Sequence, residues 1–222
     1  MHRRLMNTII DINNVSYEYP GGRRVFENLT LELNKEETTF LTGKNGCGKT
    51  TLAKLIMGIL KPTFGEIKLF GHSTREMSLG SIGERVGYVF QHPERQLFAA
   101  SVMEELTFPL LFRGYDKDEV INKAEKMLDI FDLQKVKNSY PYFLSYGEKR
   151  CLAIASVLML NPEYLILDEP TASLDIERIG VLSQVLEDLK NKNIGMLIIS
   201  HNKDFIERHK DRIINLEGGY YD

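Results

Sequence analysis

The feature that most constrains this chain of 222 residues is the segment Gly43-Lys-Asn-Gly-Cys-Gly-Lys-Thr50. It follows the pattern of two glycines separated by four residues, then a lysine, then a serine or threonine. A short apolar segment, 38–42, precedes it, and apolar residues at helical spacing follow from Thr50 to Leu60, ahead of Pro62. A strand, a glycine loop and a helix in this order predict that backbone N–H groups and a helix N-terminus face a phosphate.

The loop predicts a site for a nucleoside triphosphate. Lys49 is expected to reach the β- and γ-phosphates, and the Thr50 hydroxyl is expected to coordinate Mg²⁺. At average residue usage the pattern arises by chance in about one chain per hundred of this length, and the flanking strand and helix argue against chance. The residues of this segment that we expect to bind the nucleotide are Gly43, Asn45, Gly46, Cys47, Gly48, Lys49, Thr50 and Thr51.

A second apolar segment, Tyr164 to Leu167, ends in the two carboxylates Asp168 and Glu169. Ligands of open α/β sheets bind at the carboxyl ends of the strands, so these acids are expected to lie beside the glycine loop. Asp168 suits the coordination shell of Mg²⁺, and Glu169 suits the base that activates water. Solvated acids at a strand end are common, and it is the pairing with the loop that favours the catalytic interpretation.

The remaining patterns predict an α/β protein with three parts. Segments 8–19 and 25–33 alternate around the turn 20–23, which is typical of an antiparallel β edge. The apolar segment 196–199 predicts another strand of the parallel core, and 117–131 predicts an amphipathic helix. We expect one domain over 1–222, with a core lobe of about 1–90 and 146–222 and an inserted helical lobe of about 91–145.

Composition excludes several classes of function. A net charge of −3 provides no basic field for nucleic acid, so no nucleic-acid partner is expected. The longest apolar stretch, 152–160, is about half of a membrane span, and residues 1–7 lack the apolar core of a signal peptide. The two cysteines, Cys47 and Cys151, are expected to be reduced, since one lies in the glycine loop.

The order of further motifs resembles the ATP-binding subunits of ABC transporters over nearly the whole chain. Gln91 after an apolar strand matches the Q-loop glutamine, and His201 after Ser200 matches the switch histidine of that family. Segment 144–148, Leu-Ser-Tyr-Gly-Glu, matches the family signature, and Ser173-Leu-Asp175 matches the D-loop. Tyr19 matches the aromatic residue that stacks on adenine. The resemblance implies a P-loop ATPase of the ABC fold, with Gln91 near both Mg²⁺ and nucleotide and with Asp175 and His201 contributing to the site.

The resemblance also implies that one chain cannot complete the reaction. In that family two subunits enclose two ATP molecules head to tail, and the signature of one subunit meets the γ-phosphate held by the other. Ser145 and Gly147 would make this contact, from a helix expected over 148–160. Tyr146 stands where glycine is usual and Glu148 where glutamine is usual. Glycine gives the backbone freedom that tyrosine lacks, and Glu148 adds negative charge, so we expect a heterodimer with a related ATPase chain.

A narrower likeness covers Gln91 to Val102 and continues through Glu105 to Phe108. It resembles the Q-loop segment of the ATPases that drive cobalt, nickel and vitamin importers of the energy-coupling-factor kind, with His92 and Pro109 as departures. The resemblance implies uptake of a vitamin or a transition-metal ion through separate transmembrane subunits. It also implies a cytoplasmic location, peripheral on the inner face of the membrane. Residues after Gln91 are expected to form the groove for a helix of the membrane subunit.

Other functions remain as alternatives. A P-loop nucleotide kinase would share Gly43 to Thr50 but would not use the signature or His201. An ATPase of DNA maintenance would carry long coiled-coil insertions, and no sustained heptads occur between Thr51 and Tyr164. An ABC ATPase of another transporter class, or a non-hydrolysing ATP-binding regulator, stays open. From residues 213–219 near the end of the sequence we expect no further regulatory domain.

Overall fold

The computed structural model describes residues 7–216, so the expectations for 1–6 and 217–222 lie outside the described residues. One sheet is antiparallel, with the strand order β2-β1-β4-β5. Its strands are β1 (Thr8–Tyr19), β2 (Arg23–Asn34), β4 (Phe64–Leu69) and β5 (His72–Ser73). The predicted hairpin is confirmed, because β1 and β2 pair antiparallel from Thr8 opposite Asn34 to Tyr19 opposite Arg23.

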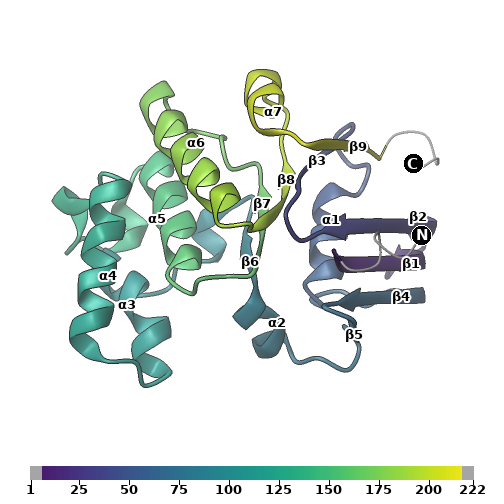
Figure 1. Ribbon diagram of the computed structural model, residues 1–222, viewed down its shortest axis with the longest axis horizontal. Helices are drawn as coiled ribbons and strands as arrows, with labels where there is room; N and C mark the ends of the chain where they lie inside the picture. Colours follow the sequence, from purple (N-terminus) through teal and green to yellow (C-terminus); the bar gives the residue numbers. More distant parts are fainter. Residues whose placement is uncertain (1–6, 217–222) are drawn as a thin grey trace.

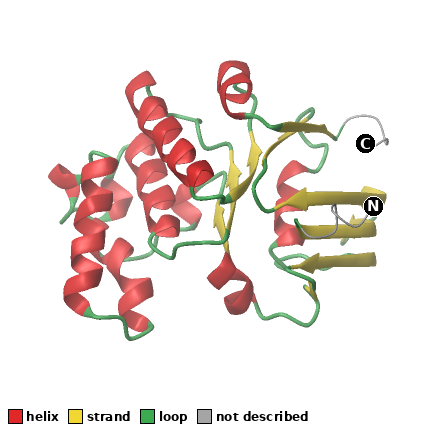
Figure 2. Ribbon diagram, viewed as in Figure 1, coloured by secondary structure: helices red, strands yellow, loops and turns green. Residues whose placement is uncertain are grey.

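The second sheet is parallel and forms the centre of the molecule (Figures 1 and 2). Its order is β6-β7-β8-β3-β9, and all neighbouring strands pair in parallel. The strands are β3 (Thr38–Thr42), β6 (Val86–Val89), β7 (Tyr164–Asp168), β8 (Gly195–Ile199) and β9 (Arg212–Asn215). The predicted parallel core is confirmed, and the apolar segments that suggested it lie at its centre.

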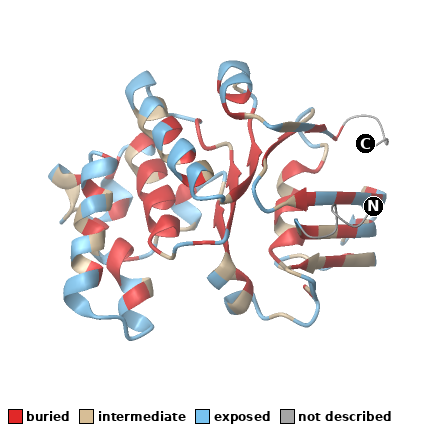
Figure 3. Ribbon diagram, in the orientation of Figure 1, coloured by how far each residue is buried: buried red, intermediate tan, exposed pale blue. Residues whose placement is uncertain are grey.

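This sheet separates two apolar cores because successive side chains of a strand point to opposite faces. Leu165 and Leu167 pack with the helices of the inserted region, whereas Tyr164 and Ile166 pack with the antiparallel sheet and the first helix. Both faces are covered, so β7 and β8 are buried along their whole length (Figure 3). A continuously apolar strand is the expected result of such double burial.

Seven α-helices and three short 3₁₀ helices complete the described residues. The helices α3, α4 and α5 gather on the side of the parallel sheet away from the antiparallel sheet (Figure 1). The α-helices are α1 (Lys49–Ile56), α2 (Leu79–Arg85), α3 (Val102–Phe112), α4 (Lys117–Ile130), α5 (Tyr146–Leu158), α6 (Ile176–Asn191) and α7 (Lys203–His209). The 3₁₀ helices are η1 (Pro93–Arg95), η2 (Gln134–Val136) and η3 (Pro141–Phe143).

Two predicted helix boundaries are wrong for local reasons. The helix α1 ends at Ile56 and not at Leu60, because Gly58 adopts a φ of 69°, the left-handed conformation that ends many helices. The helix α5 begins at Tyr146 and not at Glu148, because Ser145 caps it and Glu148 bonds back to Ser145 in a capping box. None of the helices that the structure describes is long and apolar enough to cross a bilayer.

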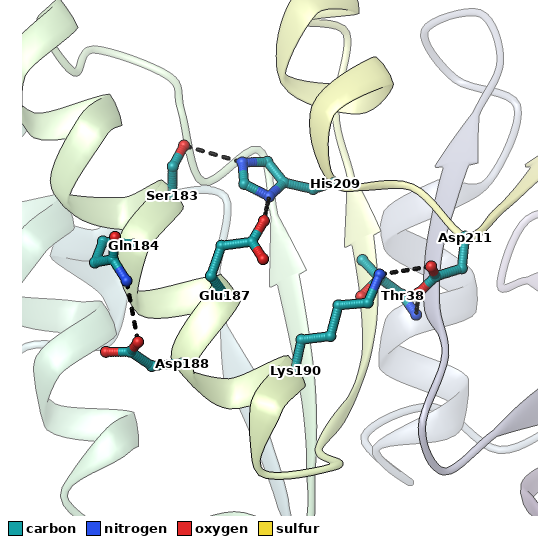
Figure 4. Close-up of polar contacts among 8 residues, drawn as sticks. All are labelled: Thr38, Ser183, Gln184, Glu187, Asp188, Lys190, His209 and Asp211. Atoms are coloured by element: carbon teal, nitrogen blue, oxygen red, sulfur yellow. Dashed lines mark hydrogen bonds and ion pairs between the residues drawn. The ribbon is translucent and has the colours of Figure 1, made fainter.

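Polar contacts hold α7 and the start of β9 against α6 and β3 (Figure 4). His209 lies between Glu187 and Ser183 of α6, with its Nδ1 3.1 Å from a Glu187 carboxylate oxygen and its Nε2 3.0 Å from the Ser183 hydroxyl. Asp211 accepts a hydrogen bond from the Lys190 ammonium at 2.5 Å and another from the Thr38 backbone N–H at 3.0 Å. These bonds fix α7 and the start of β9 relative to α6 and β3.

Candidate nucleotide-binding site

Four parallel strands deliver the predicted site residues to one edge of the sheet. The loop after β3, the residues after β6 and β8, and the end of β7 all meet at the carboxyl ends of the strands, where ligands of such sheets bind. A cavity of about 610 Å³ lies there. Of the predicted residues, those lining it are Tyr19, Asn45, Gly46, Gly48, Lys49, Thr50, Thr51, Gln91, Asp168, Glu169 and His201. The sequence therefore identified most of the wall of this cavity.

The glycine loop requires glycine at its closest contact with the β-hairpin. Gly48 has a φ of 109°, and a Cβ atom on it would lie 2.7 Å from side-chain carbons of both Val25 and Phe26. A larger residue would be strained in its backbone and would also overlap these side chains. Gly48 thus lets the loop turn into α1 against the hairpin, so that the first residues of the helix line the cavity.

The Lys49 side chain is bent over the loop that precedes it. Its ammonium donates hydrogen bonds to the carbonyl oxygens of Gly43 at 2.6 Å and of Lys44 at 3.1 Å, and it lies 4.0 Å from the Cys47 Sγ. Gly43 and Cys47 themselves do not line the cavity. Both contact the Lys49 side chain, and their expected contact with the nucleotide stays a prediction.

Thr50 and Asp168 come together although 118 positions separate them. The Thr50 hydroxyl donates a hydrogen bond of 2.6 Å to the Asp168 carboxylate. Burial raises the pKa of Asp168 above its ordinary value, while this hydrogen bond and the Arg150 charge act in the opposite direction. A hydroxyl and a carboxylate are hard oxygen ligands of the kind that Mg²⁺ takes alongside substrate phosphates.

Glu169 follows β7 in an unusual backbone conformation. Its φ of 53° is left-handed, which is uncommon for a residue other than glycine and is concentrated at functional sites. The His201 Nε2 lies 3.4 Å from a Glu169 carboxylate oxygen. Burial raises the pKa of Glu169, and the neighbouring His201 partly opposes that rise. A carboxylate with a raised pKa beside a histidine is suited to general-base chemistry.

Tyr19 and Gln91 lie at other parts of the wall. The Tyr19 hydroxyl is 3.0 Å from the Thr51 Oγ1, which joins the end of β1 to the start of α1. The Tyr19 ring packs edge-on against Tyr17, with centroids 5.0 Å apart. Gln91 comes directly after β6 and Phe90, and its backbone carbonyl accepts a hydrogen bond from Arg150. Both residues can approach a ligand in the cavity.

The predicted residues Ser145, Gly147 and Asp175 do not line the cavity. Ser145 caps α5, and Asp175 caps α6 while it also pairs with Arg178 at 3.0 Å. Gly147 is buried, and a Cβ on it would lie 3.1 Å from the Ser173 carbonyl oxygen. The signature and the D-loop are therefore in contact within this chain, away from its own nucleotide cavity.

Tyr146 occupies the signature without the backbone restriction that we expected for a tyrosine in place of glycine. Tyr146 is the first residue of α5, and its backbone is not in the left-handed region that favours glycine. Its hydroxyl donates a hydrogen bond of 3.0 Å to a Glu94 carboxylate oxygen. Tyrosine is accommodated here without backbone strain, because the first position of a helix accepts ordinary φ and ψ angles.

Sequence reasoning missed four lining residues: Pro20, Arg23, Val25 and Ile199. Arg23 is the only cation among them, and its guanidinium lies 3.4 Å from the Gly46 carbonyl oxygen. Its place directly after the turn that follows Tyr19 was the available signal. The turn brings the start of β2 beside the glycine loop. Because Tyr19 at the end of β1 was expected at the nucleotide site, the first residue of β2 could have been expected there as well.

Proteins that hydrolyse nucleoside triphosphates on a phosphate-binding loop share this arrangement of loop, strand-end acids and polarising residue. This chain is of that class. The family model described as ABC transporter matches residues 26–172. The chain therefore belongs to the ABC transporter family, as the ATP-binding, ATP-hydrolysing subunit, and the resemblance seen in its motifs is confirmed.

Individual relatives agree with this assignment. A Pyrococcus furiosus protein named as an ABC transporter ATP-binding protein is 35% identical over 211 residues, which cover 95% of this chain and 81% of that protein. An Archaeoglobus fulgidus protein of the same description is 35% identical, covering 94% and 87%. A Bacillus cereus relative is 36% identical, but the match spans only 37% of its length.

Two solved structures share the fold. CbiO1 of Clostridium perfringens, part of the ABC transporter complex CbiONQ, has a TM-score of 0.83 and 29% identity, covering 97% of this chain and 87% of that one. A dimeric ATP-binding cassette in a post-hydrolysis state, bound to ADP and Pi, has a TM-score of 0.87 and 25% identity, covering 96% and 97%. The predicted ABC ATPase fold is confirmed.

Proposed function

We propose that this chain hydrolyses MgATP to drive uptake of a vitamin or a transition-metal ion through separate membrane subunits. One observation carries the mechanism: Lys49, Asp168 and Glu169 share a cavity that Ser145 and Gly147 do not reach. A second ATPase chain has to supply the signature that closes this cavity over ATP. We propose that the chain works as one domain. This domain carries both the phosphate loop and the signature, but its signature completes the nucleotide site of the partner chain.

Roles within the cavity follow from the geometry. The Lys49 ammonium and the loop N–H groups bind the phosphates, and the Tyr19 ring lies where it can pack on the base. Thr50 and Asp168 would hold Mg²⁺, which neutralises charge on the β- and γ-phosphates. The donor set fits, since Mg²⁺ commonly takes only one or two protein oxygens and completes its shell with phosphates and water.

Glu169 is proposed to orient and deprotonate the attacking water, and His201 to hold the γ-phosphate and Glu169 in register. Their separation of 3.4 Å permits both to contact one water or phosphate oxygen. Gln91 is proposed to sense Mg²⁺ and the γ-phosphate from the end of β6. Asp175, which caps α6, would hold the D-loop for the partner chain.

The importer assignment rests on the segment after Gln91 and on the likeness to CbiO1. A transporter ATPase without a spanning helix in its described part needs a membrane subunit to act on. We place the chain on the cytoplasmic face of the membrane, held there by that subunit. The exposed side chains Phe98 and Phe108, whose rings pack edge-on with centroids 5.5 Å apart, are the proposed contact for it.

The test is Glu169→Gln in the complete transporter. Glutamine keeps the size and hydrogen-bonding groups of the side chain but removes the base, so ATP binding should persist while hydrolysis falls by about 10² to 10⁴. Glu163→Gln, at an exposed ion pair with Arg85 one strand length away, serves as the control and should hydrolyse normally. Phosphate release by Glu169→Gln within a few-fold of the wild type would contradict the role of Glu169. Identification of the membrane subunits that copurify with the chain tests the importer assignment separately.

A further inference from the structure

The unusual tyrosine of the signature makes a contact that glycine could not make. Tyr146 opens α5, and its hydroxyl donates to Glu94 of η1, three residues beyond Gln91. This hydrogen bond raises the pKa of the Tyr146 hydroxyl. The bond connects the first residue of the signature helix to the segment that follows β6, across 52 positions of sequence.

A second bond from the same helix reaches the same segment. Arg150 lies one turn after Tyr146, so the two side chains project from one face of α5. The Arg150 guanidinium donates hydrogen bonds to the carbonyl oxygens of Phe90 at 2.7 Å and of Gln91 at 2.6 Å. Its side chain is 1% exposed, and a buried guanidinium is costly unless it is hydrogen-bonded, so these bonds hold their geometry firmly.

The connected segment also forms part of the nucleotide cavity. The carbonyl of Gln91 is held by Arg150, while Gln91 itself lines the cavity beside Lys49 and Glu169. Ser145, which would meet the partner's nucleotide, precedes Tyr146 directly. Segment 90–94 therefore contacts α5 at two points, Arg150 and Tyr146, and Tyr146 adjoins Ser145.

We propose that Tyr146 and Arg150 are positioning residues that join segment 90–94 to the signature helix, so that nucleotide in this chain's cavity sets the position of the signature offered to the partner chain. Arg150 provides the buried anchor and Tyr146 the bond at the helix end. Two sites linked in this way should bind ATP cooperatively, and coupling of this kind commonly amounts to a factor of about 5 to 150 in affinity. The inference rests on the two-chain mechanism proposed above.

The experiment measures the ATP concentration at which the ATPase chains of the purified complex associate, in a Glu169→Gln background that prevents hydrolysis. Tyr146→Phe removes only the hydroxyl, and Glu94→Ala removes its acceptor. Each should raise the half-maximal ATP concentration about five- to tenfold, while ATP binding to the isolated chain changes less than about twofold. The double variant should need no more ATP for half-maximal association than either single variant does, because both substitutions remove the same hydrogen bond.

Two controls separate positioning from structure. Glu94→Gln keeps an acceptor oxygen and should restore most of the coupling, and Tyr115→Phe removes an exposed hydroxyl in the turn between α3 and α4 and should change nothing. Arg150→Lys, provided that its melting temperature stays near the wild type, should weaken association like Tyr146→Phe. Unchanged association in Tyr146→Phe, or additive losses in the double variant, would overturn the inference. If ATP causes no association even in the wild type, the two-chain mechanism fails and this inference fails with it.

Discussion

At the scale of single residues, the cavity depends on a few positions where chemistry and backbone conformation agree. Gly48 is required by φ and by close packing, and Glu169 holds a left-handed conformation at the strand end. Glycine adopts the conformation of Gly48 readily, whereas the left-handed conformation of Glu169 costs free energy that the surrounding structure must offset. Such positions respond to substitution in ways that surface residues do not.

Lys49→Ala should weaken ATP binding strongly, because it removes the one side-chain cation that the glycine loop directs at the cavity within the described residues. Calorimetry with Mg²⁺ present measures the dissociation constant. Lys54→Ala, five positions further along α1, is the matched control and should bind normally. An unchanged dissociation constant in Lys49→Ala would contradict the assigned role.

Gly48→Ala should lower the free energy of unfolding by more than Gly21→Ala does. Both glycines have nearly the same φ, 109° and 106°, but a Cβ on Gly21 meets nothing within 4 Å while one on Gly48 overlaps Val25 and Phe26. The Gly21 variant thus measures backbone strain alone, about 1 to 2 kcal/mol, and the excess loss in the Gly48 variant measures the overlap. Urea unfolding of the two variants measures the loss in the free energy of unfolding for each. Equal losses would show that Val25 and Phe26 shift to make room for the added methyl group.

At the scale of elements, α7 is held against α6 by one buried histidine. Burial lowers the pKa of His209 from its ordinary value of 6.5, with Arg208 and Lys190 acting in the same direction and Glu187 against them. The neutral ring satisfies both neighbours through its two nitrogens. The helix begins two residues after His201, so its position also constrains the segment that follows β8.

This histidine makes stability depend on pH in a defined direction. Between the lowered folded pKa and 6.5, the unfolded chain binds more protons than the folded chain, so stability falls as pH falls through that range. His209→Gln cannot protonate, and its unfolding free energy should decline less between about pH 7.5 and about pH 5.5 than that of the wild type. Parallel curves for wild type and His209→Gln would contradict this account.

At the scale of the whole molecule, the signature still favours a mixed pair of ATPase chains. Tyr146 adds no backbone strain, but the Glu148 carboxylate accepts hydrogen bonds from the Ser145 hydroxyl at 2.6 Å and from the Ser145 N–H at 2.8 Å. The carboxylate therefore occupies the hydrogen-bond donors of Ser145, and it adds negative charge where the phosphate of a nucleotide on the partner chain would approach. We expect this signature to serve its site poorly and the intact cavity here to be served by a different chain.

Comparing this chain alone with its mixture with a related ATPase chain tests that expectation. The mixed complex should hydrolyse ATP faster than the chain alone does. Glu148→Gln should reduce this difference in ATPase rate. If the chain alone associates tightly with itself and hydrolyses ATP as fast as the mixed complex, the expected preference for a mixed pair is wrong.

The exposed aromatic contact gives a prediction about coupling to transport. Phe98→Ala and Phe108→Ala should reduce transport while the ATPase chains still bind ATP, because these exposed side chains are the proposed membrane-subunit contact and lie outside the cavity. Leu97 is only partly exposed and packs on the core, so it is not a useful probe. Phe64→Ala, exposed to a similar extent on β4, is the control. Normal transport and normal copurification of the membrane subunit would place the contact elsewhere.

The sequence by itself determined the glycine loop, the buried strands and the acids that end β7. Each is fixed by a local rule, namely glycine conformation, period-two burial and polarity at a strand end. Gln91 and His201 were suggested by the resemblance to ABC ATPases, and both line the cavity, because parallel strands present their carboxyl ends at one edge.

Only the tertiary structure decided which residues meet. The bonds of Tyr146 to Glu94 and of Arg150 to Gln91 span 52 and 59 positions, and no local pattern encodes such pairings. The same holds for Arg23 at the cavity and for the separation of the signature from this chain's own nucleotide site. The physical reason is that local rules fix conformation and burial, whereas side-chain partners depend on how the packed elements are oriented.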